Sequence, residues 1–101
     1  MLSHNVFFTL NDKSDEAIAH LVAECHKYLK GHDGTVFFAA GGLNPDLDRP
    51  VNDREFDVAL HVVFDGRESH DKYQEDQRHL DFIEGNKANW ASVRVFDSDV
   101  E

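Results

Sequence analysis

The sequence predicts an α+β domain in which a four-stranded antiparallel sheet carries two helices on one face. Four short segments are rich in aromatic and β-branched residues, and two others repeat apolar residues every three or four positions. They follow one another as strand, helix, strand, strand, helix, strand, an order whose right-handed crossovers place both helices on the same face. With 101 residues, 41% of them hydrophobic, the chain has the size of one small domain, residues 1–101.

The first half of the chain contains one strand and one helix. The segment HNVFFTL predicts a strand at residues 4–10, which ends in the turn-forming residues NDKSD. Ser14 is expected to cap a helix whose first turn holds Asp15 and Glu16, and Gly31 is expected to end it. The buried face of this helix is predicted to hold Ile18, Leu21, Val22, Cys25, Tyr28 and Leu29.

The second half contains three strands and one helical region. Strands are predicted at residues 35–40, 56–64 and 92–96. The prolines, glycines, Asp and Asn residues at 41–54 predict a long loop after the second strand, of a length typical of mobile or functional loops. A helical region is expected to open near Ser69 and to end near EGNKANW.

Both faces of the predicted sheet are apolar. Alternation assigns Val6, Phe8, Val58, Leu60, Val62, Val93 and Val95 to one face and Phe7, Phe37, Ala59, Val63 and Phe96 to the other. Two helices cover only one face, so we expect the other face to form a homodimer by packing of two sheets. His61 is then expected at the dimer interface as a hydrogen-bonded structural residue.

The helical region contains an interruption in its apolar stripe. Tyr73, Leu80 and Ile83 follow helical spacing, but Asp76 and Gln77 lie between them, where another core residue belongs. An Asp can end one helical segment and cap the next one. We therefore expect either a helix break at this point or a polar site within the stripe.

Tyr73 and His79 are the candidate catalytic pair. On an unbroken helix, six residues separate their side chains by about 120° and roughly 9 Å, so they converge only if the helix breaks. After a break, both are expected to face the space between sheet and helices, together with His4. An imidazole and a phenol at one cavity can serve acid and base catalysis, or can recognise a phenol or a carbonyl.

Composition excludes several classes of partner. The formal net charge of −10 opposes binding to nucleic acid or to an anionic membrane. No apolar run approaches a membrane span, and the first residues lack the features of a signal peptide, so a cytoplasmic location is expected. The one cysteine, Cys25, lies in a helical apolar stripe and is expected to be a buried, inert thiol.

No cofactor or metal is predicted. His4, His70, Asp71 and His79 are ligand types, as are the carboxylates of PDLD, but none follows the spacing of a known metal motif. The chain also lacks the signatures of hydrolases and nucleotide-binding proteins. His26 and His32 are expected at the surface.

The segments HNVFFTL, FDVALHVVFDGRESHDKYQEDQRHLDFI and SVRVFDS together resemble the stress-responsive A/B barrel (Dabb) family of the dimeric α+β barrel superfamily. This resemblance spans nearly the whole chain. It implies a ferredoxin-like protomer and a dimer whose two sheets form a barrel. Some plant members of the family are polyketide cyclases that close a linear polyketide by aldol condensation with a Tyr and a His.

Carried over by this resemblance, Tyr73 would polarise the substrate, His79 would be the general base and His4 would line the pocket. The chain departs from the cyclases at two points. Val58 stands where they carry a further pocket His, and EDQRH lacks the Pro of the HPxH segment that is usual in the family.

Three functional hypotheses follow. The first is a small soluble homodimer that binds an apolar or aromatic molecule between sheet and helices, with His4, Val58, Leu60, Phe82 and Trp90 as candidate ligand-binding residues. The second is a cyclase-like enzyme that transfers protons through Tyr73 and His79. The third is an interaction protein without a ligand, in which these two side chains hydrogen-bond across the helix break.

Overall fold

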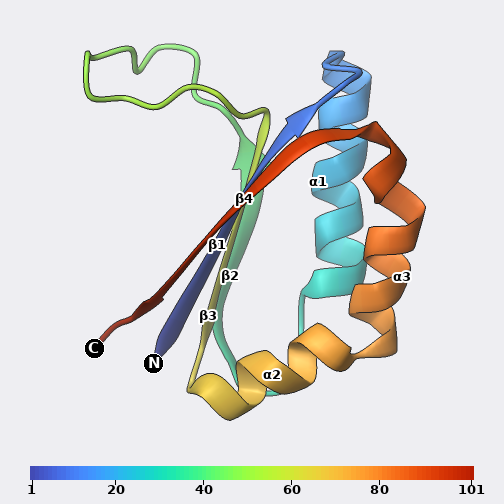
Figure 1. Ribbon diagram of the computed structural model, residues 1–101, viewed down its shortest axis with the longest axis vertical. Helices are drawn as coiled ribbons and strands as arrows, with labels where there is room; N and C mark the ends of the chain where they lie inside the picture. The colour runs from blue at the N-terminus through green and yellow to red at the C-terminus, as the bar shows by residue number, and fades with distance from the viewer.

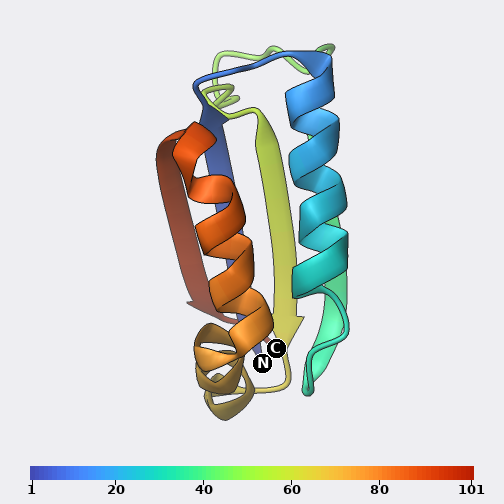
Figure 2. The same cartoon turned by 90° about the vertical axis from the view of Figure 1, so that its right-hand side faces the viewer.

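The computed structural model describes residues 1–101 and contains one four-stranded antiparallel sheet with the strand order β2-β3-β1-β4. All helices pack against the same face of this sheet (Figures 1 and 2). The predicted ferredoxin-like fold is confirmed. The elements are β1 (Leu2–Leu10), α1 (Asp15–Leu29), β2 (Thr35–Gly42), β3 (Val58–Phe64), α2 (Arg67–Glu75), α3 (Gln77–Asn86), a 3₁₀ turn η1 (Lys87–Asn89) and β4 (Trp90–Asp99).

Each of the four strands differs from its predicted bounds at one end or both. β4 extends at both ends beyond the predicted residues 92–96, and β1 begins two residues earlier than predicted. Both strands are extended because they pair with each other over most of their length, including Leu2 with Asp99. β3 begins at Val58, so the loop after β2 covers residues 43–57.

The helix α1 forms as its sequence predicts. The Ser14 side chain accepts a hydrogen bond from the Ala17 backbone N–H at 3.1 Å, which caps the first turn. Leu21, Cys25 and Leu29 are buried against the sheet and the other helices. Full burial raises the pKa of the Cys25 thiol to about 12, which agrees with the predicted inert cysteine.

The central strand β1 determines which residues share a face of the sheet. In its antiparallel register His4 lies opposite Val62 of β3 and Asp97 of β4, and paired residues point to the same side. This inner face packs against the helices and supplies most of the buried core, including Val6, Phe8, Val58, Leu60, Val62 and Phe64.

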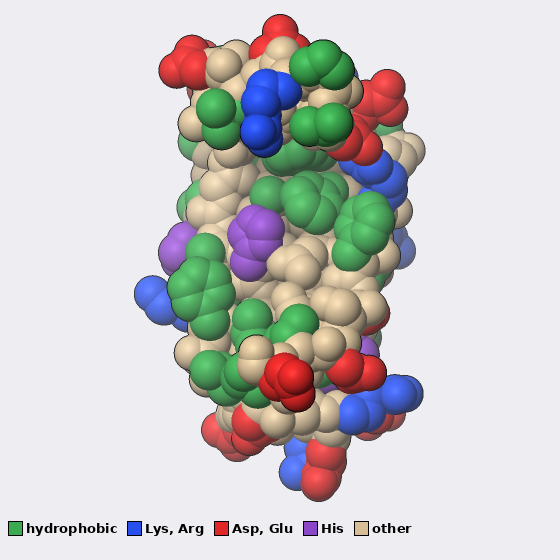
Figure 3. All heavy atoms as spheres, turned by 90° about the vertical axis from the view of Figure 1, so that its left-hand side faces the viewer, with side chains coloured by type: hydrophobic (Ala, Val, Ile, Leu, Met, Phe, Trp, Pro, Cys, Tyr) green, Lys and Arg blue, Asp and Glu red, His purple; other side chains and the backbone are tan.

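The outer face of the sheet has no helix over it. Its apolar side chains gather in a patch over the strands (Figure 3). Phe37 and Phe96 are 55% and 52% exposed, and Phe7 contacts Phe96 with ring centroids 5.7 Å apart. The loop at residues 43–57 projects on this outer side, away from the helices (Figure 1), and is tied to β4 by the ion pair between Asp53 and Arg94 at 2.7 Å.

The second helical region breaks at Asp76. This residue has extended backbone angles (φ −65°, ψ 140°), ends α2, and accepts a hydrogen bond on its side chain from the Arg78 backbone N–H at 2.8 Å. The chain therefore has three helices where the simplest reading of the sequence predicts two. The prediction that Leu80 belongs to the buried stripe is wrong, because α3 starts anew and leaves Leu80 46% exposed.

No helix of this protein has both the length and the apolar composition that are needed to span a membrane.

Gly34 holds the start of α2 against the sheet. It has a positive φ of 82°, and a Cβ added there would lie 2.0 Å from Ser69 Oγ. Its carbonyl accepts a hydrogen bond from the Asp65 backbone N–H at 2.8 Å, and Asp65 in turn accepts one from Ser69 Oγ at 2.6 Å. This close approach fixes where the helix that carries Tyr73 leaves the sheet.

We predict that Gly34→Ala destabilises the protein more than Gly31→Ala. Both glycines have φ of 82°, so each substitution costs about 1–2 kcal/mol for the left-handed conformation. Only Gly34 lacks room for a Cβ, which adds about 1–3 kcal/mol of overpacking. Urea unfolding of the two variants measures the difference, and equal losses would contradict the close packing at Ser69.

Candidate functional site

A cavity of about 170 Å³ lies between the inner face of the sheet and helices α2 and α3. Most of its lining is hydrophobic. Six of the seven residues predicted for the site line it, whereas Val58 is fully buried in the core and does not. The six are His4, Leu60, Tyr73, His79, Phe82 and Trp90.

The helix break brings Tyr73 and His79 together. Their ring centroids lie 4.7 Å apart, at an interplanar angle of 59°. Tyr73 occupies the last turn of α2 and His79 the first turn of α3, so the change of direction at Asp76 turns both rings toward the cavity. The sequence predicted that Tyr73 and His79 converge only if the helix breaks, and in the structure the helix breaks and the two rings converge.

The environment of His79 favours its neutral form. Burial, followed by the nearby His4 and His32, lowers its pKa to about 4, while the Gln74 backbone and Asp76 act in the opposite direction. The His79 ring is therefore largely protonated only below about pH 4. At neutral pH His79 therefore offers an uncharged imidazole to the cavity.

Tyr73 is almost completely buried, with 2% of its surface exposed. Desolvation raises the pKa of its hydroxyl, so the phenol stays protonated at all ordinary pH values. A protonated phenol is a hydrogen-bond donor.

Three cavity-lining residues hold buried polar atoms without a partner in the protein. These atoms are the Tyr73 hydroxyl, Nδ1 of His79 and Nε1 of Trp90. Only one other buried side-chain atom, Oγ1 of Thr35, is unpartnered in the same way. Because buried polar groups in folded proteins nearly always have partners, three such atoms on residues that line the same cavity are a feature of the site.

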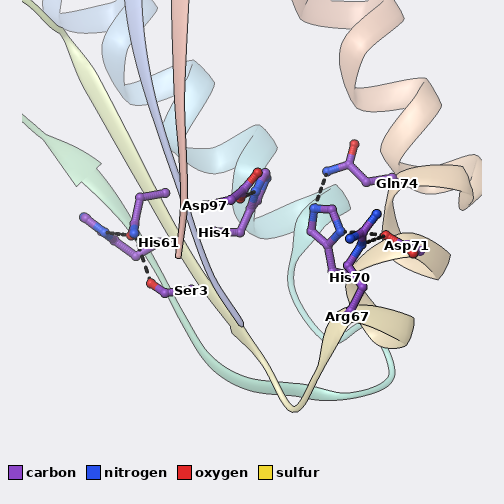
Figure 4. Close-up of polar contacts among 9 residues, drawn as sticks. Ser3, His4, His61, Arg67, His70, Asp71, Gln74 and Asp97 are labelled. Atoms are coloured by element: carbon purple, nitrogen blue, oxygen red, sulfur yellow. Dashed lines mark hydrogen bonds and ion pairs between the residues drawn. The ribbon is translucent and has the colours of Figure 1, made fainter. Parts of the chain in front are cut away.

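His4 lines the cavity and contacts Asp97, a residue outside the cavity lining that was not among the predicted site residues. Its Nδ1 lies 2.5 Å from Oδ1 of Asp97 on β4 (Figure 4). The register that places Asp97 beside His4 became visible only with strand pairing, because 93 positions separate the two residues. Gln74, Val6, Phe8, Leu29, Ile83, Val93 and Val95 also line the cavity and were not predicted to do so.

His32 contradicts its predicted surface position. It is buried, its Nε2 lies 2.7 Å from the Tyr28 backbone oxygen, and its ring centroid lies 5.0 Å from that of Tyr73. The loop after α1 folds back against α2 and covers the ring. His32 therefore supports Tyr73 from the side away from the cavity.

Comparison with known proteins identifies the family. The stress responsive A/B barrel domain, Dabb, matches residues 2–100. The chain belongs to the Dabb family. Among curated proteins, none matches this sequence.

Three solved structures similar to this Dabb protein illustrate the fold. A dimeric ferredoxin-like protein of unknown function from Thermobifida fusca has a TM-score of 0.79 and 17% identity, covering 98% of this chain and 90% of that one. A Dabb protein with a ferredoxin-like fold from Mesorhizobium loti has a TM-score of 0.78 and 16% identity, covering 99% and 96%. A hydroxynitrile lyase from Passiflora edulis has a TM-score of 0.77 and 17% identity, covering 99% and 93%. At these identities the likeness shows a shared fold.

The ligand types considered for a metal are distributed unevenly. His4, His70 and Asp97 have ligand atoms that lie within 4.8 Å of one another. His79 does not belong to this group, and the carboxylates of the PDLD segment lie in the loop that projects on the other side of the sheet.

The low pKa of His79 predicts that acid destabilises this protein. The unfolded chain takes up a proton near the ordinary value of 6.5, whereas folded His79 does so only near 4, so the unfolded state binds more protons between these values. As pH falls from 7 to 4, we expect His79 to lower the free energy of unfolding by about 1 to 3 kcal/mol. The lower part of this range allows for the partial contact of the ring with water.

Urea unfolding at several pH values checks this expectation. His79→Gln should flatten the loss of stability between pH 7 and 4, since the groups facing the ring, His4, His32 and Asp76, remain in place. The control His20→Gln changes an exposed ring and should leave the wild-type pH dependence intact. An unchanged slope in His79→Gln would show that its pKa is ordinary.

Proposed function

We propose that this Dabb protein binds a small aromatic or apolar molecule that carries a carbonyl or phenol oxygen, in the cavity between the sheet and α2 and α3. The three unpartnered atoms of Tyr73, His79 and Trp90 carry this proposal. Two of them are donors, and the neutral imidazole supplies the third polar contact. A ligand oxygen would satisfy donors that the protein itself leaves unpaired.

The size of the cavity limits the ligand. At about 170 Å³ it is smaller than the 300–1,000 Å³ typical of drug-sized sites. Apolar cavities of about 150 Å³ accommodate benzene. A single substituted ring therefore matches the available space, whereas a long chain would have to extend through the open side beside Val93 and Val95, which are 39% and 50% exposed.

The ligand-free alternative requires a hydrogen bond that is not formed. It explains Tyr73 and His79 as partners across the helix break, yet no hydrogen bond joins them, and the Tyr73 hydroxyl has no partner within the protein. This observation favours a site that is completed by another molecule.

We predict that a single-ring probe, 4-hydroxyacetophenone, raises the melting temperature in a saturable manner. Tyr73→Phe should abolish the shift without lowering the stability of the free protein, because it removes a buried hydroxyl that has no partner. Tyr28→Phe is the matched control, since Tyr28 lies on α1 outside the cavity lining. Heteronuclear NMR shifts at Trp90 Nε1–H locate the bound ring.

The same experiment separates the alternatives. No saturable shift with this probe or with acetophenone and phenol would leave water as the partner of the three atoms and would refute the binding site. A lower melting temperature for free Tyr73→Phe would indicate a structural hydrogen bond of the hydroxyl.

A proton-transfer enzyme of the cyclase type is the second candidate, favoured by the 4.7 Å approach of the Tyr73 and His79 rings. In such an enzyme His79 would remove a proton beside a carbonyl while Tyr73 stabilised the enolate. A base with a pKa of about 4 is always free at neutral pH but weak, so binding ranks above catalysis. Exchange of the probe's methyl protons for deuterium, present in wild type and lost in His79→Gln, would reverse that ranking.

Two copies of the chain are proposed to pair through the outer face of the sheet. Phe37 and Phe96 leave an apolar patch exposed there, and the similar Thermobifida fusca structure is described as dimeric. His61 lies on the same face and is hydrogen-bonded through its Nδ1 to Asn5 Oδ1 at 2.7 Å (Figure 4). A hydrogen bond formed within one chain suits a polar side chain at an interface between sheets.

We predict a mass of twice 11.5 kDa by light scattering after size-exclusion chromatography. Phe96→Asp places a charge in the patch and should yield the single-chain mass. Leu80→Asp is the control, because Leu80 is similarly exposed but lies on α3 at the opposite side of the sheet. A monomeric wild type, or equal effects of both variants, would contradict the assignment of the interface.

A further inference from the structure

His4, His70 and Asp97 form a cluster where α2 crosses the end of the sheet (Figure 4). They come from β1, α2 and β4, and their ligand atoms lie within 4.8 Å of one another. The rings of His4 and His70 meet at 66° with centroids 5.1 Å apart. No local sequence motif reveals this cluster, because three separate elements supply it.

The chemical types in the cluster match a transition-metal site. Two imidazoles and one carboxylate are a donor set used for Zn²⁺ and similar ions, and they leave positions open for water. Mg²⁺ and Ca²⁺ prefer oxygen ligands alone. The ion would thus be a divalent transition metal.

Neighbouring side chains orient His70 for metal binding. Its Nδ1 lies 3.0 Å from Oδ1 of Asp71, which is itself held by Nε of Arg67 at 2.8 Å. The side-chain amide nitrogen of Gln74 lies 3.5 Å from His70 Nε2. Since an amide nitrogen can only donate, these contacts assign the proton to Nδ1 and a lone pair to Nε2.

This arrangement is the one that metal-binding histidines use. Such a residue typically donates one ring N–H to a carboxylate and binds the ion through the other nitrogen. Asp71 fills the place of that carboxylate. A metal ion at His70 Nε2 would replace the long contact of the Gln74 amide, which is directed at the same lone pair.

The remaining adjustment is small and falls partly on an exposed side chain. Ligand atoms around a zinc ion lie about 3.4 Å apart, given bonds of about 2.1 Å, so His4 Nδ1 and Asp97 Oδ1, now 2.5 Å apart, have to separate by roughly 1 Å, and no pair in the cluster has to close by more than about 1.4 Å. The side chains of His4 and His70 are 6% and 14% exposed, whereas that of Asp97 is 44% exposed and lies near the end of β4. Asp97 can therefore rotate, and its exposed side gives an ion access from solvent.

We propose that His4, His70 and Asp97 bind one divalent transition-metal ion per chain, at the end of the sheet beside the cavity. The ion takes the place of the proton between His4 Nδ1 and Asp97. The proposed metal site shares His4 with the cavity, but the unpartnered atoms of Tyr73, His79 and Trp90 take no part in it, so metal binding can be tested in the absence of the proposed ligand.

The test is titration of the tag-free protein with Co²⁺, followed by calorimetry and visible absorption. Wild type should bind one Co²⁺ per chain with bands characteristic of nitrogen ligation, and Zn²⁺ should displace it. His70→Leu should weaken binding at least a hundredfold. Asp71→Asn should weaken it by about 10–100-fold, since it removes only the group that orients His70.

His26→Ala is the matched control, because His26 is exposed on α1 and lies outside the cluster. Circular dichroism establishes that each variant is folded. Wild-type affinity in folded His70→Leu would overturn the proposal, as would an equal loss in His26→Ala. Weakening by Asp97→Asn but not by His70→Leu would mean that the cluster is an ordinary His–Asp pair.

Discussion

The break at Asp76 is the constraint on which the rest of the site depends. On a continuous helix the side chains of Tyr73 and His79 would diverge by about 120° and be separated by roughly 9 Å along the axis. Instead their centroids lie 4.7 Å apart, because Asp76 ends α2 and caps α3 with its own side chain. A polar residue on an apolar stripe thus acts through the backbone, by changing the direction of the chain.

The same break explains why a cavity exists here. α3 runs along the sheet, whereas α2 lies across its end (Figures 1 and 2), so one continuous row of helical side chains cannot fill the space beneath the corner. Leu80, which would belong to that row, is turned to solvent instead. Aromatic rings of Tyr73, Phe82 and Trp90 line the remaining space.

Sequence patterns predicted much of this fold and only part of the site. Strand alternation and the α1 stripe depend on local spacing, which a single sequence displays directly. At Asp76 the sequence predicted either a helix break or a polar site within the apolar stripe, and it did not decide between them. Contacts of His4 with Asp97 and of Tyr73 with His32 could not be predicted, because they depend on strand register and on the path of a loop. Val58 was placed at the site by its face of the sheet, but depth in the core depends on neighbours that alternation does not describe.

His4 joins the two regions of chemistry in this Dabb protein. It lines the cavity, its ring centroid lies 6.0 Å from that of Tyr73, and it also belongs to the cluster with His70 and Asp97. Because β1 is paired with a strand on each side, the backbone at His4 has little freedom. An ion bound at the cluster would therefore change the orientation of the His4 ring and leave its backbone in place. If both proposed sites are occupied, the shared His4 ring would couple them, and thermodynamic linkage requires the effect of each ligand on the affinity of the other to be equal. A divalent ion bound at His4 would bring further positive charge close to His79, so an occupied cluster would keep the His79 ring in its neutral form.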